Sequence, residues 1–314
     1  MTKTGVVMDK IETISPKKDT TLGLMLEAQK RGHELYYMTI ADIYLKNGIA
    51  FGMVRRIEVF ESETNWFKYR SGYYEIELGE LDLILMRKDP PFNDNYIYMT
   101  YVLEKAHTAG CKVVNNPVSV RNANEKLMAT HFPQCCPQTI IDCNPDRIRD
   151  FVNKYGEAVI KPLDGMGGSS IFKLERNDKN TNVIIETVTQ QFTKFVMVQE
   201  FIPEISDGDK RILIINGKPV PYGLSRIPAD GEFRGNLAAG GRGESRELTD
   251  KELWICEQVI PELIKRELQF VGIDVIGGYL TEVNVTSPTC MREIESERQI
   301  NIAGDFFDGV ETEI

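Results

Sequence analysis

The chain is organised around one stretch, Ala158-Val159-Ile160-Lys161-Pro162-Leu163-Asp164-Gly165-Met166-Gly167-Gly168-Ser169-Ser170-Ile171-Phe172. A short apolar run ends in Lys161, a loop with three glycines follows, and a second apolar run begins at Ile171. Glycine has no Cβ atom, so its backbone turns tightly and approaches a ligand closely, and successive N–H groups in such a loop can surround phosphate oxygens. The stretch therefore predicts a strand, a phosphate-covering flap and a returning strand. The alternative is an ordinary hairpin with a surface lysine, because short glycine patterns often occur by chance.

The composition is ordinary for a globular protein, and its charge argues against several partners. The 314 residues, 42% of them hydrophobic, are enough for two or three packed units. A net charge of −10 argues against nucleic acid or an anionic membrane as partner. No apolar run approaches the roughly 20 residues of a membrane helix. Without a secretory pattern at the start, and with six cysteines that match no zinc or disulfide spacing, we expect a cytoplasmic protein with reduced thiols.

The first part of the chain predicts a parallel sheet with helices on its faces, because strand and helix patterns alternate. In such sheets ligands bind beyond the carboxyl ends of the strands. Arg87-Lys88-Asp89-Pro90-Pro91 lies at one such end, and its positive pair favours a ligand loop over a solvated turn. Asn47-Gly48 predicts a hairpin that opens an antiparallel excursion to about Glu80. The expected strands are 4–8, 34–39, 81–86 and 111–115, and the expected helices are 20–32 and 95–109.

A second unit is expected from about Arg121, with a short helix at 124–128 and a longer helix between Asn144-Pro145 and Gly156. The strand 196–202 runs into Pro203, an arrangement that suits an adenine slot as well as a plain strand exit. Beyond strands at 212–215 and 218–226, residues 227–243 carry Arg234, Arg242 and several glycines. A loop of this length is usually functional or disordered, and we interpret it as an active-site lid. Thr249 and Glu252 form a capping-box pattern for a helix to about Leu268.

Two predicted strands near the C-terminus, 272–276 and 280–285, form a hairpin that carries carboxylate side chains. Side chains alternate faces along a strand, so Glu282 and Asn284 share a face. A three-residue turn would pair Asp274 with Glu282 and leave the apolar residues together, whereas a two-residue turn would mix the faces. Register follows the hydrophobic pattern, so we predict the three-residue turn. The resulting oxygen cluster suits Mg²⁺ or Mn²⁺, and a solvated polar face is the alternative.

Ser287 to Glu293 follows the hairpin directly, and its hydroxyls and Arg292 suit the binding of a carboxylate. Cys290 raises the question of a covalent nucleophile. No histidine lies in the local sequence to activate the thiol, so covalent catalysis is disfavoured.

Four segments together resemble the bacterial glutathione synthetases of the ATP-grasp superfamily, and the similarity covers nearly the whole chain. They are Met86-Arg87-Lys88-Asp89-Pro90-Pro91-Phe92, Lys161-Pro162-Leu163-Asp164-Gly165-Met166-Gly167-Gly168, Arg234-Gly235-Asn236-Leu237-Ala238-Ala239-Gly240-Gly241 and Glu282-Val283-Asn284-Val285-Thr286-Ser287-Pro288-Thr289.

The resemblance implies an α/β (α+β) chain with the ATP-grasp fold. Its expected units are an N-terminal parallel-sheet, substrate-binding domain (residues 1–121), a central lid domain (122–202) and a C-terminal catalytic domain (203–314) with the flexible loop 227–243. It implies ATP-dependent ligation of γ-glutamylcysteine to glycine through an acyl phosphate, with Mg²⁺ or Mn²⁺, in a homotetramer. Ligation of another acid and amine is the alternative. A non-catalytic nucleotide-binding module is disfavoured, because the metal ligands and lid arginines are present.

The resemblance also implies a role for each site residue. The nucleotide would contact Lys126, Lys161, Gly165, Gly167, Gly168, Gln199, Glu200, Phe201, Ile202 and Asp209. The metals would bind Asp274, Glu282 and Asn284. Catalysis would depend on Arg211, Asn284 and Arg234. The peptide carboxylates would be held by Arg87, Arg226, Arg234, Ser287, Thr289 and Arg292.

Overall fold

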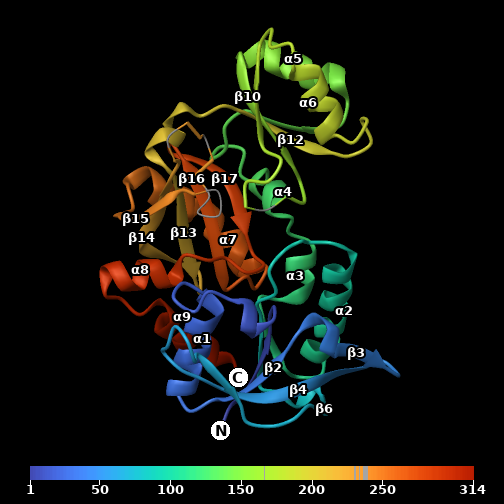
Figure 1. Ribbon diagram of the computed structural model, residues 1–314, viewed down its shortest axis with the longest axis vertical. Coiled ribbons are helices and arrows are strands. Elements are labelled where there is room, and N and C mark those ends of the chain that lie inside the picture. Colours follow the sequence, from blue (N-terminus) through green and yellow to red (C-terminus); the bar gives the residue numbers. More distant parts are fainter. Residues whose placement is uncertain (166, 230, 233, 236–239) are drawn as a thin grey trace.

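The computed structural model describes residues 1–165, 167–229, 231–232, 234–235 and 240–314. Three sheets follow one another along the long axis of the molecule (Figure 1). The first sheet lies at one end, and the sheet from the middle of the sequence, which we call the central sheet, lies at the other end. The third sheet lies between them. No helix of the described residues is long and apolar enough to cross a membrane.

The first sheet contains the predicted parallel strands. It has the order β3-β4-β2-β1-β7-β8, and β1, β2, β7 and β8 run parallel. Asp19 caps the first helix, because its side chain accepts a hydrogen bond from the Leu22 N–H at 2.7 Å. The strands are β1 (Lys3–Val7), β2 (Glu34–Met38), β7 (Leu83–Met86) and β8 (Lys112–Val114), and the helices are α1 (Thr20–Lys30), α2 (Asp94–Thr108) and α3 (Pro117–Arg121).

The excursion between β2 and β7 is antiparallel, as predicted. Asn47 and Gly48 both have left-handed backbones, with φ of 53° and 82°, and they turn β3 (Ile43–Lys46) into β4 (Ile49–Val59). The short strands β5 (Phe67–Tyr69) and β6 (Tyr74–Glu77) pair with β4.

The central sheet has the order β11-β10-β12-β9 and is antiparallel throughout. β10 and β11 are neighbours on either side of the glycine loop, so the prediction of a strand before and after this loop is confirmed. The elements are α4 (Glu125–Ala129), β9 (Thr139–Asp142), α5 (Pro145–Tyr155), β10 (Glu157–Pro162), β11 (Phe172–Glu175), α6 (Thr181–Val188) and β12 (Val196–Glu200).

The third sheet has the order β15-β14-β13-β16-β17. Helix α7 begins with the predicted capping box of Thr249 and Glu252 but ends at Lys265, three residues before the predicted end. Of the predicted lid loop 227–243, residues 230, 233 and 236–239 lie outside the described part, and Arg242 already belongs to β15. The elements are β13 (Asp209–Ile215), β14 (Lys218–Ile227), β15 (Arg242–Glu247), α7 (Asp250–Lys265), β16 (Phe270–Ile276) and β17 (Tyr279–Asn284).

The β16–β17 hairpin has the predicted pairing but a different turn. Asp274 lies opposite Glu282, and Ile273 lies opposite Val283, as the apolar pattern predicts. The turn itself has two residues, because Ile276 pairs with Tyr279 across Gly277 and Gly278. A bulge beyond Asp274 then shifts the register by one residue, which a β-bulge does by placing one extra residue on one strand. The prediction of a three-residue turn was therefore wrong.

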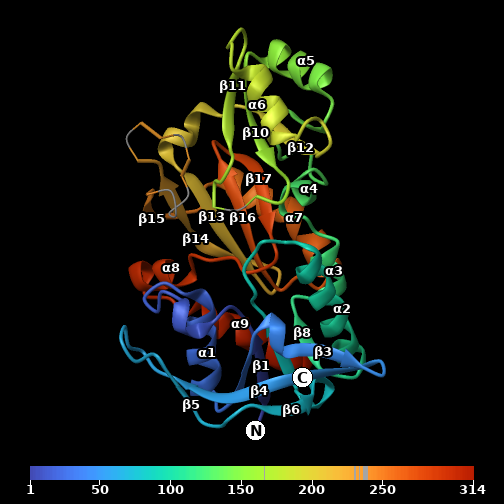
Figure 2. The same ribbon diagram turned by 45° about the vertical axis from the view of Figure 1, so that its right-hand side comes forward.

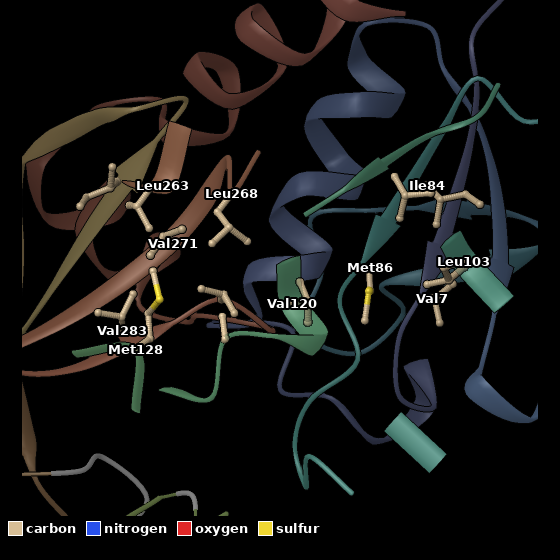
Figure 3. Packing of buried hydrophobic residues seen from close by; sticks show 14 of the residues in the cluster. Val7, Ile84, Met86, Leu103, Val120, Met128, Leu263, Leu268, Val271 and Val283 are labelled. Atoms are coloured by element: carbon tan, nitrogen blue, oxygen red, sulfur yellow. The ribbon is translucent and has the colours of Figure 1, made fainter. Parts of the chain in front are cut away.

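The hydrophobic cores show which units are packed together. One core joins Val7, Ile84, Met86 and Leu103 of the first unit to Leu263, Val271 and Val283 of the third (Figure 3). A second core joins α1 to the last helices, α8 (Met291–Arg298) and α9 (Ile302–Val310), beside which α1 lies in both ribbon views (Figure 2). The central sheet has a separate core with α5 and α6. The first and third units therefore form one packed body, which includes α4, whereas no described residue of the central sheet belongs to its cores.

Candidate active site

A cleft with a cavity volume of about 350 Å³ lies where the central and third sheets face each other. Residues of β10, β12 and the glycine flap line one side, and residues of β13, β14, β16 and β17 line the other. The volume is within the range of about 300–1,000 Å³ that is usual for small-molecule sites.

Asp274 is the centre of a buried charge cluster on the third sheet. Its carboxylate accepts hydrogen bonds from the guanidinium of Arg211, at 3.0 Å for Nη2, and pairs with Arg226 at 3.0 Å. Burial acts to raise the pKa of Asp274, but these two cations outweigh it and hold the pKa below its usual range. Glu282 and Asn284 lie on the same face and also line the cleft.

Gly272 allows this cluster to form. A Cβ atom built there would lie 2.8 Å from Cδ of Arg211 and 2.8 Å from Cβ of Pro288, closer than real contacts permit. The absence of a side chain thus lets Arg211 and Pro288 converge over the strand.

Two lysines bring positive charge to the opposite side of the cleft. The Lys126 ammonium donates to the Gly165 carbonyl at 2.9 Å and lies 3.5 Å from the Glu282 carboxylate. Lys161 is buried, and none of the described residues forms a hydrogen bond or ion pair with its ammonium. Burial therefore lowers the pKa of Lys161. A buried cation of this kind suits an anionic ligand.

The glycine flap is held from two sides. Asn124 donates to the Leu163 carbonyl at 3.1 Å, next to the Lys126 contact, and Arg234 donates to the Gly168 carbonyl at 3.2 Å. Gly167 and Gly168 have left-handed backbones, with φ of 63° and 79°, which glycine adopts without strain. Arg234 thus connects the described part of the lid loop to the flap.

The strand β12 and its continuation, from Gln199 to Ile202, form an apolar and amide-bearing edge of the cleft. Asp209 lies nearby on β13 and pairs with Arg226, but its Oδ1 atom is buried and has no hydrogen-bond partner among the described residues. Burial raises the pKa of Asp209 to about 6. This carboxylate, which lines the cleft, therefore retains an unused acceptor.

Beyond β17, residues 286–290 form one wall of the cleft, and we call them the wall segment. Ser287 and Thr289 contribute hydroxyls there. The Cys290 thiol is fully buried, and burial raises its pKa despite the nearby arginines. A thiol with a raised pKa is a poor nucleophile, which agrees with the argument against covalent catalysis.

Comparison with known proteins identifies the family. The model of the prokaryotic glutathione synthetase N-terminal domain matches residues 2–121, and the model of the prokaryotic glutathione synthetase ATP-grasp domain matches residues 125–299. The chain belongs to the prokaryotic glutathione synthetase family. Glutathione synthetases are 52% identical in Pseudomonas syringae pv. tomato, over 99% of this chain and 97% of that protein, and 48% identical in Escherichia coli O127:H6, over 100% and 99%.

Solved structures show the same fold at much lower identity. The ATP-grasp ligase PsnB, in complex with minimal precursor, Mg and ADP, is 17% identical with a TM-score of 0.62, covering 99% of this chain and 97% of that one. D-cycloserine synthetase DcsG is 12% identical with a TM-score of 0.67, covering 98% and 99%. The predicted ATP-grasp fold is confirmed, and the family makes the chain an ATP-dependent carboxylate–amine ligase.

Most residues that the family resemblance predicts for the site line this one cleft. Arg87 and Arg292 do not: Arg87 is buried beneath the wall segment, and Arg292 donates to the Pro16 carbonyl at 3.0 Å and pairs with Glu61. Sequence reasoning missed Glu125, whose pKa burial raises to about 7. Its position beside Lys126 at the start of a helix was the available signal. The predicted site residues that line the cleft are Lys126, Lys161, Gly165, Gly167, Gly168, Gln199, Glu200, Phe201, Ile202, Asp209, Arg211, Arg226, Arg234, Asp274, Glu282, Asn284, Ser287 and Thr289.

Proposed function

We propose that this chain makes glutathione by joining γ-glutamylcysteine to glycine, with ATP converted to ADP and phosphate. One observation carries the proposal: the cationic glycine flap and the acidic β16–β17 hairpin face the same cleft. A triphosphate with its metal needs both kinds of partner, because its oxygens bind cations and N–H groups while its metal binds oxygen ligands.

The nucleotide would lie between the central and third units. Lys126 and Lys161 are assigned to the α- and β-phosphates, and the flap glycines would cover them with backbone N–H groups. Gln199 to Ile202 and Asp209 would line the base and ribose. Lys161 is buried with no direct hydrogen-bond or ion-pair partner among the described residues, and this supports the assignment, because an anion in the cleft would offset the cost of burying the ammonium.

The chemistry would take place in two steps. A carboxylate is a poor electrophile, so a carboxylate oxygen of the cysteinyl group first attacks the γ-phosphorus and ADP leaves. The glycine nitrogen then attacks the acyl carbon, the C–O bond to phosphate breaks, and the amine loses a proton. Phosphoryl transfer depends on positioning and charge stabilisation. Arg211 and Asn284 would supply these at the acyl phosphate, and a donor of this kind contributes roughly 3 kcal/mol.

The carboxylates of the peptide would be held by Arg226, Arg234, Ser287 and Thr289, which line the same cleft. The contact between Arg234 and the Gly168 carbonyl supports a second role for this arginine, in closing the lid loop and flap together. A closed lid excludes water that would otherwise hydrolyse the acyl phosphate.

A divalent cation fits the donor set of the hairpin. Asp274, Glu282 and Asn284 offer two carboxylates and an amide on one face, and the described residues hold no cluster of three or more His, Cys, Asp or Glu in a metal-binding arrangement. Mg²⁺ keeps several waters and takes substrate phosphates as further ligands, so a small protein donor set suits it, and Mn²⁺ accepts the same oxygens. When bound, the metal would neutralise charge on the β- and γ-phosphates.

Phosphate release from ATP and MgCl₂ tests the proposal. We expect release to depend on γ-glutamylcysteine and glycine together, and mass spectrometry to show glutathione. If another acid–amine pair releases phosphate and this pair releases no more than ATP alone, the chain is an ATP-grasp ligase of different specificity.

The assembly and the location of the chain are proposals from the family resemblance: a homotetramer in the cytoplasm. The β3–β4 hairpin protrudes from the body (Figure 1) and exposes Leu45 and Ile49, each 45% accessible, which supports a contact surface there. Light scattering gives the mass to compare with the 35.7 kDa chain.

A further inference from the structure

Side chains of the first unit donate hydrogen bonds to backbone carbonyls in and beside the wall segment. This segment lies between the end of β17 and the start of α8 and belongs to no helix or strand. Buried carbonyl groups need hydrogen-bond donors. Two carbonyls here have one: Val285, just before the wall segment, accepts from Nδ2 of Asn115 at 2.8 Å, and Pro288, in the middle of the segment, accepts from Nη2 of Arg87 at 2.8 Å.

Asn115 uses all of its hydrogen-bonding capacity on the third sheet. Its amide nitrogen also donates to the Phe270 carbonyl at 2.9 Å, and its oxygen accepts from the backbone N–H groups of Gln269 at 2.8 Å and Phe270 at 2.9 Å. The side chain is buried, with 4% of the residue exposed. It therefore holds the beginning of β16 and the end of β17 together from outside the sheet.

Arg87 holds the middle of the wall segment, at the Pro288 carbonyl. Its guanidinium lies 4.9 Å over the ring of Phe270, and Nε donates to Oγ1 of Thr21 at 3.3 Å. Burial lowers the pKa of Arg87 to about 10, so the group remains charged at neutral pH. Among the described residues no carboxylate forms an ion pair with it, and the shorter of its two hydrogen bonds is the one that the Pro288 carbonyl accepts.

These two anchors come from corresponding places in the first sheet. Arg87 follows directly on β7, Asn115 follows directly on β8, and the two strands are parallel neighbours. This carboxyl edge is where open parallel sheets bind ligands. Here it binds a segment of the same chain that forms the wall of the cleft.

The wall segment is also connected to the reacting end of the cleft. Pro288 and Arg211 converge over Gly272, and Arg211 holds Asp274. A shift of Pro288 would therefore displace the guanidinium that faces the proposed acyl phosphate.

We propose that Arg87 and Asn115 are positioning residues that clamp the wall segment in its catalytic place, and that neither contacts the substrate. The clamp itself is inferred from the hydrogen bonds. Its effect on the reaction rests on the proposed function. It gives Arg87 a different role from the carboxylate binding that the family resemblance implies.

Hydrogen exchange on the ligand-free chain tests the clamp without any assay of activity. In Arg87→Met and Asn115→Asp we expect the amides of the wall segment to exchange about tenfold faster or more, because each loses charged or amide donors to buried carbonyls. Arg121→Met is the matched control: Arg121 also donates to a threonine, Thr100 at 3.2 Å, and lies 3.9 Å over a tyrosine ring, and these partners belong to α2 and not to the wall segment. Unchanged exchange in both variants would overturn the clamp.

A double-mutant cycle tests the link to the reaction. Arg87→Met and Thr289→Ala should each lower kcat/KM for γ-glutamylcysteine about tenfold, and the double variant should lose little more, because both act through the wall segment. Arg87→Lys should recover part of the loss, and the KM for ATP should stay unchanged. Additive losses would show that Arg87 contacts the substrate independently. If the wild-type chain shows no such activity while the wall loosens in Arg87→Met, the proposed function fails and the clamp stands.

Discussion

At the scale of single residues, the cleft is built from buried charges that are unequally compensated. Asp274 has two arginine partners, whereas the ammonium of Lys161 has no described hydrogen-bond partner. Burying a charge without a partner lowers stability. Such an arrangement is expected where a ligand completes the charge balance. At Lys161 the buried charge should lower the stability of the ligand-free chain and favour binding of an anionic ligand.

Lys161→Met should therefore stabilise the ligand-free chain and weaken nucleotide binding. We expect the free energy of unfolding at pH 7 to rise by about 1 kcal/mol, because the pKa of Lys161 is lowered by burial and the charged form is disfavoured in the folded state. The KM for ATP should rise at least about tenfold. Urea unfolding with and without an ATP analogue measures both. Lys154→Met, at a lysine stacked on Tyr155 in α5, is the control. A destabilised Lys161→Met that keeps its affinity for ATP would contradict the assignment.

At the scale of elements, the β16–β17 hairpin shows what sequence patterns can and cannot predict. The apolar alternation was sufficient to predict that Asp274 lies opposite Glu282, because only that pairing leaves Ile273 and Val283 on one face. The turn could not be predicted from the same pattern, because a bulge restores the register after a two-residue turn. Local signals such as Asn47-Gly48 and the Thr249–Glu252 box were reliable, since each is satisfied within a few residues.

A substitution at Gly272 tests the role of the hairpin in activity and stability. Gly272→Ala places a methyl group against both Arg211 and Pro288, so we expect kcat to fall at least about tenfold and stability to fall by about 1–3 kcal/mol. Gly72→Ala is a matched control, because a Cβ atom there meets nothing within 4 Å. Steady-state kinetics and thermal unfolding of the two variants check the expectation. Equal behaviour of Gly272→Ala and Gly72→Ala would show that the convergence over Gly272 has no consequence.

At the scale of the whole molecule, the distribution of the hydrophobic cores indicates which units are fixed to one another and which can change their relative position. The first and third units share hydrophobic cores, to which α4 also contributes Met128 and Ala129, whereas the central sheet with α5 and α6 has its own. The flap, carried by the central sheet, can therefore change its distance from the hairpin without disrupting a shared core. The hydrogen-bond partner of Arg87 could not be predicted from the sequence, because the acceptor, the Pro288 carbonyl, is 201 residues away along the chain and belongs to another unit.

The central claim is that the glycine flap and the acidic hairpin close over one triphosphate. A crystal structure with a non-hydrolysable ATP analogue and Mg²⁺ tests it most directly. The account predicts phosphate oxygens within hydrogen-bond distance of the Lys126 and Lys161 ammonium groups, and a metal ion held by Asp274, Glu282 and Asn284 on the other side of the same phosphates. A nucleotide bound elsewhere, or a triphosphate that contacts the flap while its metal is remote from the hairpin, would contradict it.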